Sequence, residues 1–551
     1  MKTKSLYNVT KYFLSTVVLY VAFLLFTSCD THNLEVNMGG GTASGATLLV
    51  TVSMPEADPQ TRISHEQDGL TVRIAWQSGD KIDLLVVHGG EETVYREVSV
   101  TVDETNNKKA TFPLTLPDGT YETFDLYGVY GGGGLDSENP RLVKLPTVAQ
   151  STSSSLKEIE KNKAVVLVFS QTGISRDIPD LKIGFKHIGS LFNIQVKNTS
   201  ETDTLDKVTE ARLTASSTIP AYSNSGAETY DITTGAFSGT QTTFLTCLPV
   251  SSSNVVPEGI LEFWAWIPLN LGGNAEASWP ALGLEIVSNG TSIATPGTKP
   301  ARTATVGKTY HLYATHDGSA LTFATAAEMT VAPGKLADFR DGNLYKIVTI
   351  GSQTWMAQNL AYLPSVNKSN VSYEDLYYYV YDNAGKEGTE NVAEAKNLGN
   401  YIAYGVLYNW LAAFTACPDG WHLPSATEWE QLKNYLIVNS FNYDGSTTGN
   451  KIAKSLASES GWDSSTVEGS PGNSSDDYSE YKNKSGFTGL PGGFRGAGNN
   501  FNNKGQEGNW WSSTLSSKSS SYYWYLKHSE IEFNNSFRAQ NSGCSVRCVK
   551  D

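Results

Sequence analysis

The sequence predicts a mainly β protein with two β-sandwiches followed by an α+β domain. Short runs of alternating apolar and polar residues, separated by turn residues, extend from Ala46 to about Thr315. Long amphipathic helical patterns are scarce in this region. From Asp338 onward the composition shifts to Trp, Tyr, Asn and Gly, and two helix signals appear. A chain of 551 residues is long enough for such domains to bury separate cores.

The N-terminus predicts export. Positive Lys2, Lys4 and Lys11 precede an apolar run from Phe13 to Phe26, which is shorter than the ~20 residues of a membrane-spanning helix. We therefore expect a signal peptide at residues 1–28. Small residues followed by Cys29 resemble a lipoprotein signal-peptidase box, in which the thiol becomes acylated, for example by palmitate. The alternative is an ordinary secretory signal with an incidental cysteine.

Residues 29–45 are rich in Gly, Asn and Thr, a composition typical of a flexible tether. More than one acyl chain on Cys29 would hold the mature chain stably on a membrane. We expect a lipid-anchored protein on the outer membrane, at the cell surface.

Charge and cysteine usage exclude several classes of function. The net charge is −15 and no Lys/Arg block occurs, which argues against a nucleic-acid partner. Besides Cys29, the four cysteines lack zinc-site spacing, and no nucleophile elbow, HExxH or phosphate loop is present. We therefore expect no enzyme, no catalytic residues, no metal site and no cofactor.

The first sandwich is expected at residues 46–150. Its predicted strands are Ala46–Met54, two strands within Thr71–Val87 around a Gly79–Asp80 turn, Lys109–Leu116 and Tyr121–Tyr130. Their alternation suits sheets with one buried face.

The second sandwich is expected at residues 151–316, after a connection at Thr147–Lys163. A weakly patterned linker at 317–334 follows it. The predicted strands of this sandwich are Ala164–Phe169, Leu191–Val196, Phe244–Pro249, Ile260–Ile267 and Tyr310–Tyr313.

The α+β domain is expected at residues 335–551, with helices at Tyr404–Ala416 and Ser425–Tyr435. Ser425 can cap the second helix, and Glu428 three residues later completes a capping box.

This last domain resembles the Fibrobacter succinogenes major paralogous (FISUMP) domain, which implies an extracellular domain of mostly undetermined function. The matching segments also look like the C-type-lectin-like and formylglycine-generating-enzyme architecture. They are Asp338–Tyr345, Ile350–Leu360, Tyr404–Trp410, Cys417–Ser425, Leu490–Arg495, Trp510–Thr514 and Val546–Asp551.

The FISUMP resemblance implies a disulfide between Cys417 and Cys548. Cys544 is then an addition, which either pairs with Cys247 or stays a buried thiol. The close pair of Cys544 and Cys548 also resembles the copper-binding pair of a formylglycine-generating oxidase, although its spacing is one residue short.

The N-terminal region resembles the fimbrillin family, which implies two transthyretin-like sandwiches in a pilus subunit or a related surface protein. The segments that carry the resemblance are Thr61–Arg62, Trp76–Ile82, Lys109–Phe112 and Phe185–Leu191.

In such pili a protease cuts after an arginine and removes the first strand, and a strand of the next subunit fills the groove. Here Arg62 would be the cut site and Thr47–Met54 the removable strand, unless Arg62 is an ordinary loop residue. Because the C-terminus lies inside another domain, we expect this chain to accept a strand but not to donate one, as a tip subunit would.

Two groups of residues are candidates for ligand binding. Dense aromatics beside amides and an arginine could stack on a sugar, or they could form a core: Arg495, Asn499, Trp510, Trp511, Tyr522, Tyr523, Trp524 and Tyr525. Acidic residues in one polar loop could hold calcium, or they could be solvated: Asp463, Glu468, Asp476, Asp477 and Glu480.

The first hypothesis is adhesion as a fimbrial tip or accessory subunit. Its partners would be other pilus subunits by donor-strand exchange and a host or microbial glycan or protein ligand. The second is a membrane-tethered glycan-binding protein for nutrient capture that does not polymerise. The third is a formylglycine-generating-type oxidase.

Overall fold

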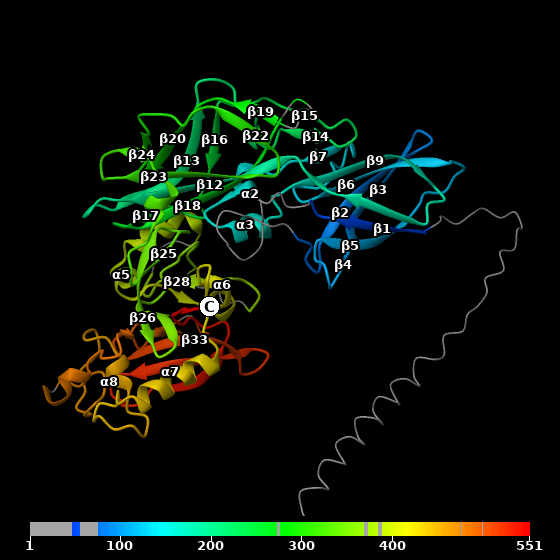
Figure 1. Cartoon of the computed structure of the whole chain (residues 1–551). Helices are drawn as coiled ribbons and strands as arrows, with labels where there is room; N and C mark the ends of the chain where they lie inside the picture. The colour runs from blue at the N-terminus through cyan, green and yellow to red at the C-terminus, as the bar shows by residue number, and fades with distance from the viewer. Residues whose placement is uncertain are drawn as a thin grey trace, which may run out of the picture. The chain divides into compact units, whose positions relative to one another are not determined.

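The computed structural model describes most of the chain (Figure 1). The described residues are 47–55, 75–270, 272, 276–367, 373–383, 388–474, 476–498 and 500–551. The expected signal peptide and tether, Cys29, Arg62 and Asn499 lie outside them. The protein is mainly β, as predicted. Within the described residues, no helix is both long and apolar enough to cross a membrane.

Two sheets form the first sandwich. The first has the order β10 (Asp180–Gly184), β1 (Thr47–Ser53), β5 (Lys109–Thr115) and β4 (Thr101–Val102). The second has the order β11 (Lys186–His187), β9 (Leu167–Ser175), β6 (Thr123–Tyr130), β2 (Lys81–His88) and β3 (Glu91–Ser99). Alternate residues of β1 and β5 are buried, which is the pattern of strands with one face toward a core.

The boundary between the sandwiches differs from the expected residue 150. Strands β9, β10 and β11 lie in the sheets of the first sandwich, so Ala164–Phe169 contributes to β9 and not to the second sandwich. Of the two strands expected in Thr71–Val87, only β2 is present among the described residues, because Ala75–Gln77 are not in a strand.

The second sandwich also has two main sheets. One has the order β24 (Leu321–Phe323), β23 (Thr309–His316), β12 (Gly189–Asn198), β18 (Ile260–Pro268) and β8 (Thr152–Ser153). The other has the order β16 (Phe244–Cys247), β13 (Leu205–Ala215), β20 (Leu282–Ser288) and β21 (Thr291–Ala294), with β17 (Ser253–Val255) paired to β13. Both β12 and β18 are buried along their whole length, so both faces of this sheet centre are covered.

Smaller elements complete this region. One ribbon joins β15 (Ala236–Ser238), β14 (Thr229–Asp231) and β7 (Leu142–Lys144), and another joins β19 (Glu276–Trp279) to β22 (Arg302–Thr305). The expected connection at 147–163 contains α2 (Val148–Ser151) and α3 (Leu156–Lys161) as well as β8. The expected linker at 317–334 contains β24 and the 3₁₀ helix η1 (Ala326–Met329), so it is not structureless.

The C-terminal domain has mixed α and β elements, as predicted. One sheet has the order β25 (Lys335–Asp338), β26 (Asn343–Ile350), β27 (Gln353–Met356), β36 (Val549–Lys550) and β30 (Trp421–His422). Another has the order β33 (Glu507–Leu515), β34 (Ser520–Lys527) and β35 (Asn534–Ala539). Two short pairs are β28 (Tyr378–Tyr379) with β29 (Leu407–Tyr408) and β31 (Phe494–Arg495) with β32 (Phe501–Asn502).

Several helices lie between these strands along the chain. They are η2 (Thr389–Asn391), α4 (Val392–Lys396), α5 (Gly399–Tyr404), α6 (Trp410–Ala416), α7 (Ala426–Val438), α8 (Ala453–Leu456) and η3 (Asp476–Tyr481). The helix expected at 404–416 is therefore broken: α5 ends at Tyr404 and α6 begins after Asn409. Gly405 causes the break, since its φ of 74° lies in the left-handed region and a Cβ there would come 2.7 Å from the carbonyl oxygen of Leu360.

Helix α7 begins as predicted. The Ser425 hydroxyl accepts a hydrogen bond from the Glu428 amide, and the Glu428 carboxylate accepts one from the Ser425 amide. We expect Ser425→Ala to lower the stability of this domain by about 1 kcal/mol, because orphan amides of the first turn lose their acceptor. Thermal unfolding checks this, with the exposed Thr427→Ala in the same turn as control. Equal melting temperatures for Ser425→Ala and the native chain would contradict the cap's role.

Candidate functional site

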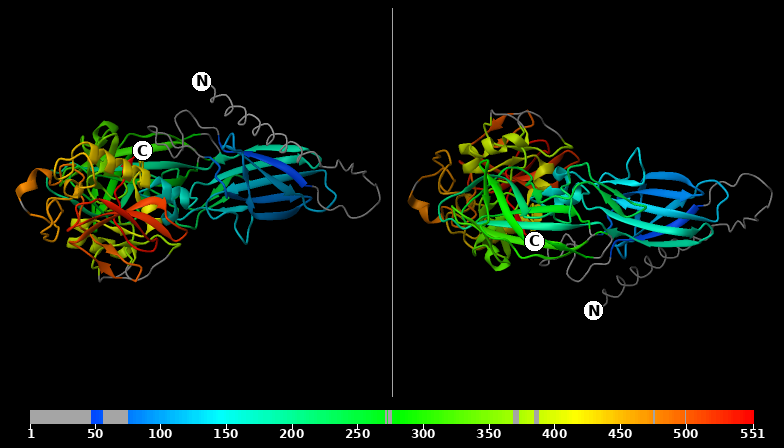
Figure 2. Two further views of the ribbon diagram at one scale, coloured as in Figure 1. Left: turned by 90° about the horizontal axis from the view of Figure 1, so that it is seen from below. Right: turned by 90° about the horizontal axis from the view of Figure 1, so that it is seen from above.

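Strand β1 is the first described element, and it lies inside a sheet. It is hydrogen-bonded between β10 and β5, and it runs parallel to β10 with Leu49 opposite Asp180 and Ser53 opposite Gly184. The amide of Met54 also donates to the carbonyl of Lys108 at 2.8 Å. Figure 2 shows β1, in dark blue, alongside the other strands of this sandwich in both views.

The inward side chains of β1 complete the core of the first sandwich. Leu48, Val50 and Val52 of β1, and Met54 directly after it, are each at most 4% exposed, whereas Leu49 on the outer face is 52% exposed. Burial of four such side chains contributes roughly 6 to 12 kcal/mol as an upper bound. Without β1, the sandwich would have an apolar groove and unpaired backbone groups along β10 and β5.

The connectivity of β1 makes it separable. The described chain leaves β1 at Pro55 and returns at Ala75, and the next strand, β2, belongs to the other sheet. Arg62 falls in the connection between these points, outside the described residues. A cut in this connection would detach β1 from the rest of the sandwich without breaking another described strand.

The predicted disulfide is present in the structure. The sulfurs of Cys417 and Cys548 are 2.12 Å apart, across a sequence separation of 131 residues. The bond ties the end of α6 to the residue before β36, and Val549 of β36 pairs with Trp355 and His422. This last described strand is therefore held covalently and by backbone pairing.

The other two described cysteines are buried free thiols. Burial raises the pKa of Cys247 to about 12 and that of Cys544 to about 11, so both are protonated at neutral pH. They do not pair with each other. Because Cys548 is bonded to Cys417, Cys544 and Cys548 do not form the free pair that a copper oxidase of the formylglycine-generating type would need.

Several of the predicted sugar-binding residues are placed in the core instead. Arg495, Trp510, Trp511 and Trp524 are each at most 1% exposed, so no sugar can stack on these rings. The indole N–H of Trp511 donates to the carbonyl of Tyr408 at 2.7 Å, and that of Trp510 donates to Asn359 at 2.9 Å. Their assignment as ligand residues is wrong, and Asn499 lies outside the described residues.

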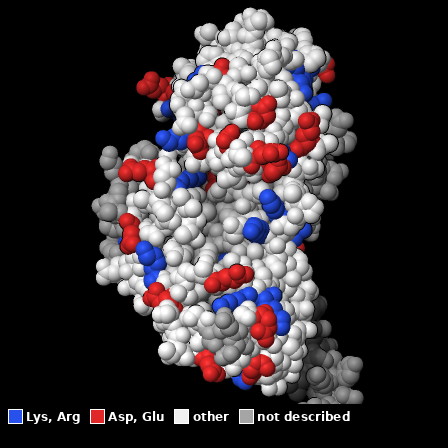
Figure 3. All heavy atoms as spheres, turned by 90° about the vertical axis from the view of Figure 1, so that its left-hand side faces the viewer, with Lys and Arg blue, Asp and Glu red and all other residues white. Residues whose placement is uncertain are grey.

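The acidic loop shows no metal site in the part that the structure describes. No group of three or more His, Cys, Asp or Glu side chains is close enough to hold an ion among those residues. The side chains of Asp476 and Asp477 are not among those described. On the face shown in Figure 3, acidic and basic side chains are interspersed and form no continuous basic surface.

A cluster of buried charges lies at the start of the C-terminal domain. Arg340 donates to both carboxylate oxygens of Asp338, at 2.7 and 2.6 Å, and to the carbonyl of Ala416 at 2.7 Å. The Nζ of Lys396 lies 4.0 Å from Asp341, whose pKa is raised to about 6, chiefly by burial. These groups satisfy one another and tie β25 to the end of α6, so they have a structural role.

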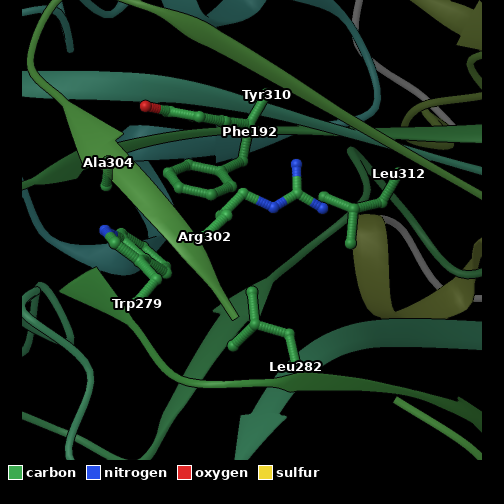
Figure 4. Close-up of a pocket in the computed structure, with 7 residues that line it drawn as sticks. All are labelled: Phe192, Trp279, Leu282, Arg302, Ala304, Tyr310 and Leu312. Carbon is green, nitrogen blue, oxygen red and sulfur yellow. The ribbon is translucent and has the colours of Figure 1, made fainter. Parts of the chain in front are cut away.

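Among the described residues, the second sandwich contains a narrow apolar recess of about 10 Å³, which is room for about one water molecule. The rings of Phe192 and Tyr310 stack with centroids 5.1 Å apart, and Figure 4 shows Arg302 extending between Phe192 and Leu312. None of the side chains that line the recess is a carboxylate, a cysteine or a histidine. The lining residues are Phe192, Trp279, Leu282, Arg302, Ala304, Tyr310 and Leu312.

Residues 348–550 match the model of the family described as the Fibrobacter succinogenes major domain. The C-terminal domain is a domain of this kind. The match runs from the end of β26 to β36 and includes the disulfide and α7, so the resemblance predicted for this region is confirmed. No curated protein matches the chain.

Solved structures similar to the chain cover about half of it. A "putative cell adhesion protein" from Bacteroides ovatus has a TM-score of 0.31 and 14% identity, over 52% of this chain and 97% of its own. The fimbrial anchor protein Mfa2 from Porphyromonas gingivalis has a TM-score of 0.26 and 8% identity, over 51% and 96%. The tip fimbrial protein Mfa3 from the same organism, with a C-terminal truncation, has a TM-score of 0.26 and 9% identity, over 51% of this chain and 98% of its own. Since these scores are low, the function proposed below rests on the geometry of this chain.

Within the Fibrobacter-type domain, His422 joins two carboxylates. Its Nδ1 lies 2.6 Å from Asp551 and its Nε2 lies 2.7 Å from Glu428 of the α7 capping box. Burial alone would lower the pKa of His422, but the hydrogen bonds to Asp551 and Glu428 outweigh it and raise the pKa above 6.5. For Glu428, burial is likewise outweighed, here by hydrogen bonds from Ser425 and His422, which lower its pKa.

These shifts predict a pH dependence of stability. A raised histidine pKa stabilises the folded state below 6.5, and this contribution is lost as the pH rises through the folded-state value. We expect His422→Ala to lower stability by up to about 1 kcal/mol at mildly acidic pH and by less at alkaline pH, because the site is partly solvent-screened. Urea unfolding at several pH values measures this, with Asp551→Asn expected to remove part of the effect. A difference from the native chain that does not change with pH would contradict the prediction.

Proposed function

We propose that this chain is exported as a lipid-anchored protein of the outer cell surface and, once the segment up to Arg62 is removed, acts in adhesion as a fimbrial tip or accessory subunit, and not as an enzyme. Its first sandwich would accept a strand from another subunit in place of β1. The observation that carries the proposal is the position of β1: it is buried between β10 and β5, yet joined to the sandwich through a single connection.

The assembly step follows from this geometry. Cleavage after Arg62 would leave β1 held only by its hydrogen bonds and its buried side chains. An incoming strand with apolar side chains at alternate positions could restore the same contacts, since a sheet accepts a new strand through backbone hydrogen bonds and side-chain pockets. The partner is therefore an extended segment of another subunit.

A subunit that accepts a strand but donates none would stand at the end of a fimbria or beside it. A donating subunit must release a strand, but β36 follows Cys548 directly and is paired on both sides within its own domain. The strand before it, β35, is paired with β34. We propose that the Fibrobacter-type domain is presented at the end of the assembly, where it can meet a ligand.

A second function is favoured by one observation. In the structure β1 fills its own groove, so the sandwich is complete without a strand from a partner. Such a chain would be a membrane-tethered glycan-binding protein for nutrient capture, and it would not polymerise.

N-terminal sequencing and intact mass of the protein from the native cell surface separate these functions. A mature chain that starts at Ile63 supports the accepting subunit, and a chain that starts at acylated Cys29 supports the tethered protein. Arg62→Ala should abolish the cut, whereas Arg73→Ala in the same connection should leave it. Processing that is unchanged in Arg62→Ala would contradict the proposed cut site.

A further inference from the structure

One face of the β33–β34–β35 sheet places two of the aromatic candidates, Tyr523 and Tyr525, beside an arginine that the sequence did not single out, Arg538. Side chains alternate along β34, so Trp524 and Leu526 face one core cluster, while Tyr523, Tyr525 and Lys527 lie on the opposite face, where Tyr523 also packs against a second core cluster that includes Trp511. These three outward side chains are half-buried and not fully covered. Two further half-buried side chains, Phe494 of β31 and Arg538 of β35, lie beside them.

The five side chains form a continuous series of ring and cation contacts, which we call the ladder (Phe494, Arg538, Tyr523, Tyr525 and Lys527). The Arg538 guanidinium carbon lies 3.4 Å from the Phe494 ring centroid and 4.6 Å from that of Tyr523. The Tyr523 and Tyr525 centroids are 5.8 Å apart, and the Lys527 Nζ lies 5.1 Å from the Tyr525 centroid. Contacts of this kind hold the rings and the guanidinium in defined positions.

The two cations of the ladder differ in their charge partners. Lys527 forms an ion pair with Glu530 at 2.7 Å. Among the described residues, the guanidinium of Arg538 has no ion pair and no hydrogen bond; its Nη1 is buried, so an anion would reach it through Nε and Nη2. The guanidinium lies on the rings of Phe494 and Tyr523 and has no carboxylate partner among the described residues. A carboxylate is the group whose geometry fits a guanidinium best.

Polar side chains lie next to the rings of the ladder. Across the β34–β35 pair, Tyr525 is opposite Asn534 and Tyr523 is opposite Ser536, which places an amide and a hydroxyl on the same face. Asn534 and Ser536 are also half-buried. Aromatic faces beside amides and hydroxyls suit a pyranose ring, since its C–H groups stack on the ring while its hydroxyls form hydrogen bonds.

We propose that the ladder binds a saccharide residue that carries a carboxylate. The carboxylate would pair with Arg538, and the sugar ring would lie against Tyr523 and Tyr525. Sialic and uronic acids share this chemistry. The inference deepens the adhesion function proposed above, and it rests on that function only for the ligand's biological role.

Binding to the full chain tests the proposal. Titration calorimetry would use sialyllactose, a glucuronate-containing disaccharide and neutral lactose as probes, and the two acidic probes distinguish the two sources of the carboxylate. We expect at least one acidic probe to bind and lactose to bind about tenfold more weakly or not at all, because it lacks the charge partner. Arg538→Gln and Tyr525→Ala should each weaken acidic-probe binding about tenfold, and Arg538→Lys should weaken it less.

Controls separate binding from folding. Arg176 of the first sandwich also lies on a ring, 4.4 Å from the Tyr121 centroid, so Arg176→Gln should leave binding unchanged. Thermal unfolding of each variant must match the native chain, and Tyr525→Phe, which keeps the ring, should retain the stacking contribution.

Four outcomes would overturn the proposal. They are no binding of either acidic probe, equal binding of lactose, native affinity in Arg538→Gln, and displacement of the acidic probe by a polyglutamate peptide at equal concentration. The last would assign the ladder to acidic protein segments. If no saccharide binds, the N-terminus found by sequencing the mature chain is unaffected. The binding test and the test of the strand-accepting function can therefore fail independently.

Discussion

Replacing Val50 by Asp should unfold the first sandwich of the uncut chain. Val50 is fully buried in β1, between β10 and β5, on the inner face of the strand, which carries the apolar side chains of Leu48, Val50 and Val52. An unpaired carboxylate at such a position costs about 4 kcal/mol or more, because it loses its hydration and gains no partner. Urea unfolding followed by limited proteolysis would show cleavage within residues 75–187 at low denaturant.

The same strand supplies a matched control. Leu49 is the neighbour of Val50, and its side chain is 52% exposed on the outer face. Leu49→Asp should therefore change stability by less than about 1 kcal/mol. Equal stability of the two variants would show that β1 does not contribute its inner face to the core.

The Val50→Asp variant is also expected to affect the stability of the uncut chain but not that of the subunit assembled in a fimbria. If a partner strand replaces β1, an assembled subunit no longer contains residue 50. Its stability in the fimbria should then equal that of the native subunit. A destabilised assembled subunit would mean that β1 stays in place.

The second large effect concerns the disulfide. Cys417→Ser combined with Cys548→Ser should lower the stability of the C-terminal domain by about 4 kcal/mol or more, because a loop of 131 residues is no longer closed in the unfolded chain. The tryptophans of this domain, including Trp429 and Trp510 in one core cluster, make its unfolding visible by fluorescence. Cys544→Ala, at a buried free thiol, should cost less.

Reduction provides an independent measurement of the same bond. Dithiothreitol should lower the melting temperature of the native chain to that of the double serine variant and should leave the variant unaffected. An unchanged native chain after verified reduction would contradict the stabilising role of the bond. A similar loss in Cys544→Ala would assign the effect to core packing.

The alternation of apolar and polar residues predicted where strands lie better than it predicted which strands pair with one another. The alternation in Ala46–Met54 and Lys109–Leu116 corresponds to β1 and β5, and the capping box at Ser425 marks the start of α7. The boundary at residue 150 failed because β9 and β10 return to the first sandwich after β7, α2, β8 and α3. Periodicity within a segment carries no information on such long-range pairing.

The candidate site shows the same limit. Trp510 and Trp511 are adjacent in β33 and must point to opposite faces, yet both are buried because the strand is covered on both sides. Tyr523 and Tyr525 were among the aromatic candidates, but the place of Arg538 beside them could not be predicted, since it depends on the register of β34 with β35 and on the position of β31. The separable position of β1 became clear only from its neighbours in the sheet.

A disulfide staple across β1 and β10 tests the central claim most directly. Thr51 and Lys182 are register partners on the outer face, within reach of a disulfide for paired strands, so Thr51→Cys with Lys182→Cys would fix β1 in its groove. We predict that the stapled chain is still cut after Arg62, retains the β1 fragment through the disulfide, and does not enter fimbriae until it is reduced. The single-cysteine variants should enter normally. Incorporation of the oxidised, stapled chain at the native level would show that β1 is not exchanged and would contradict the account.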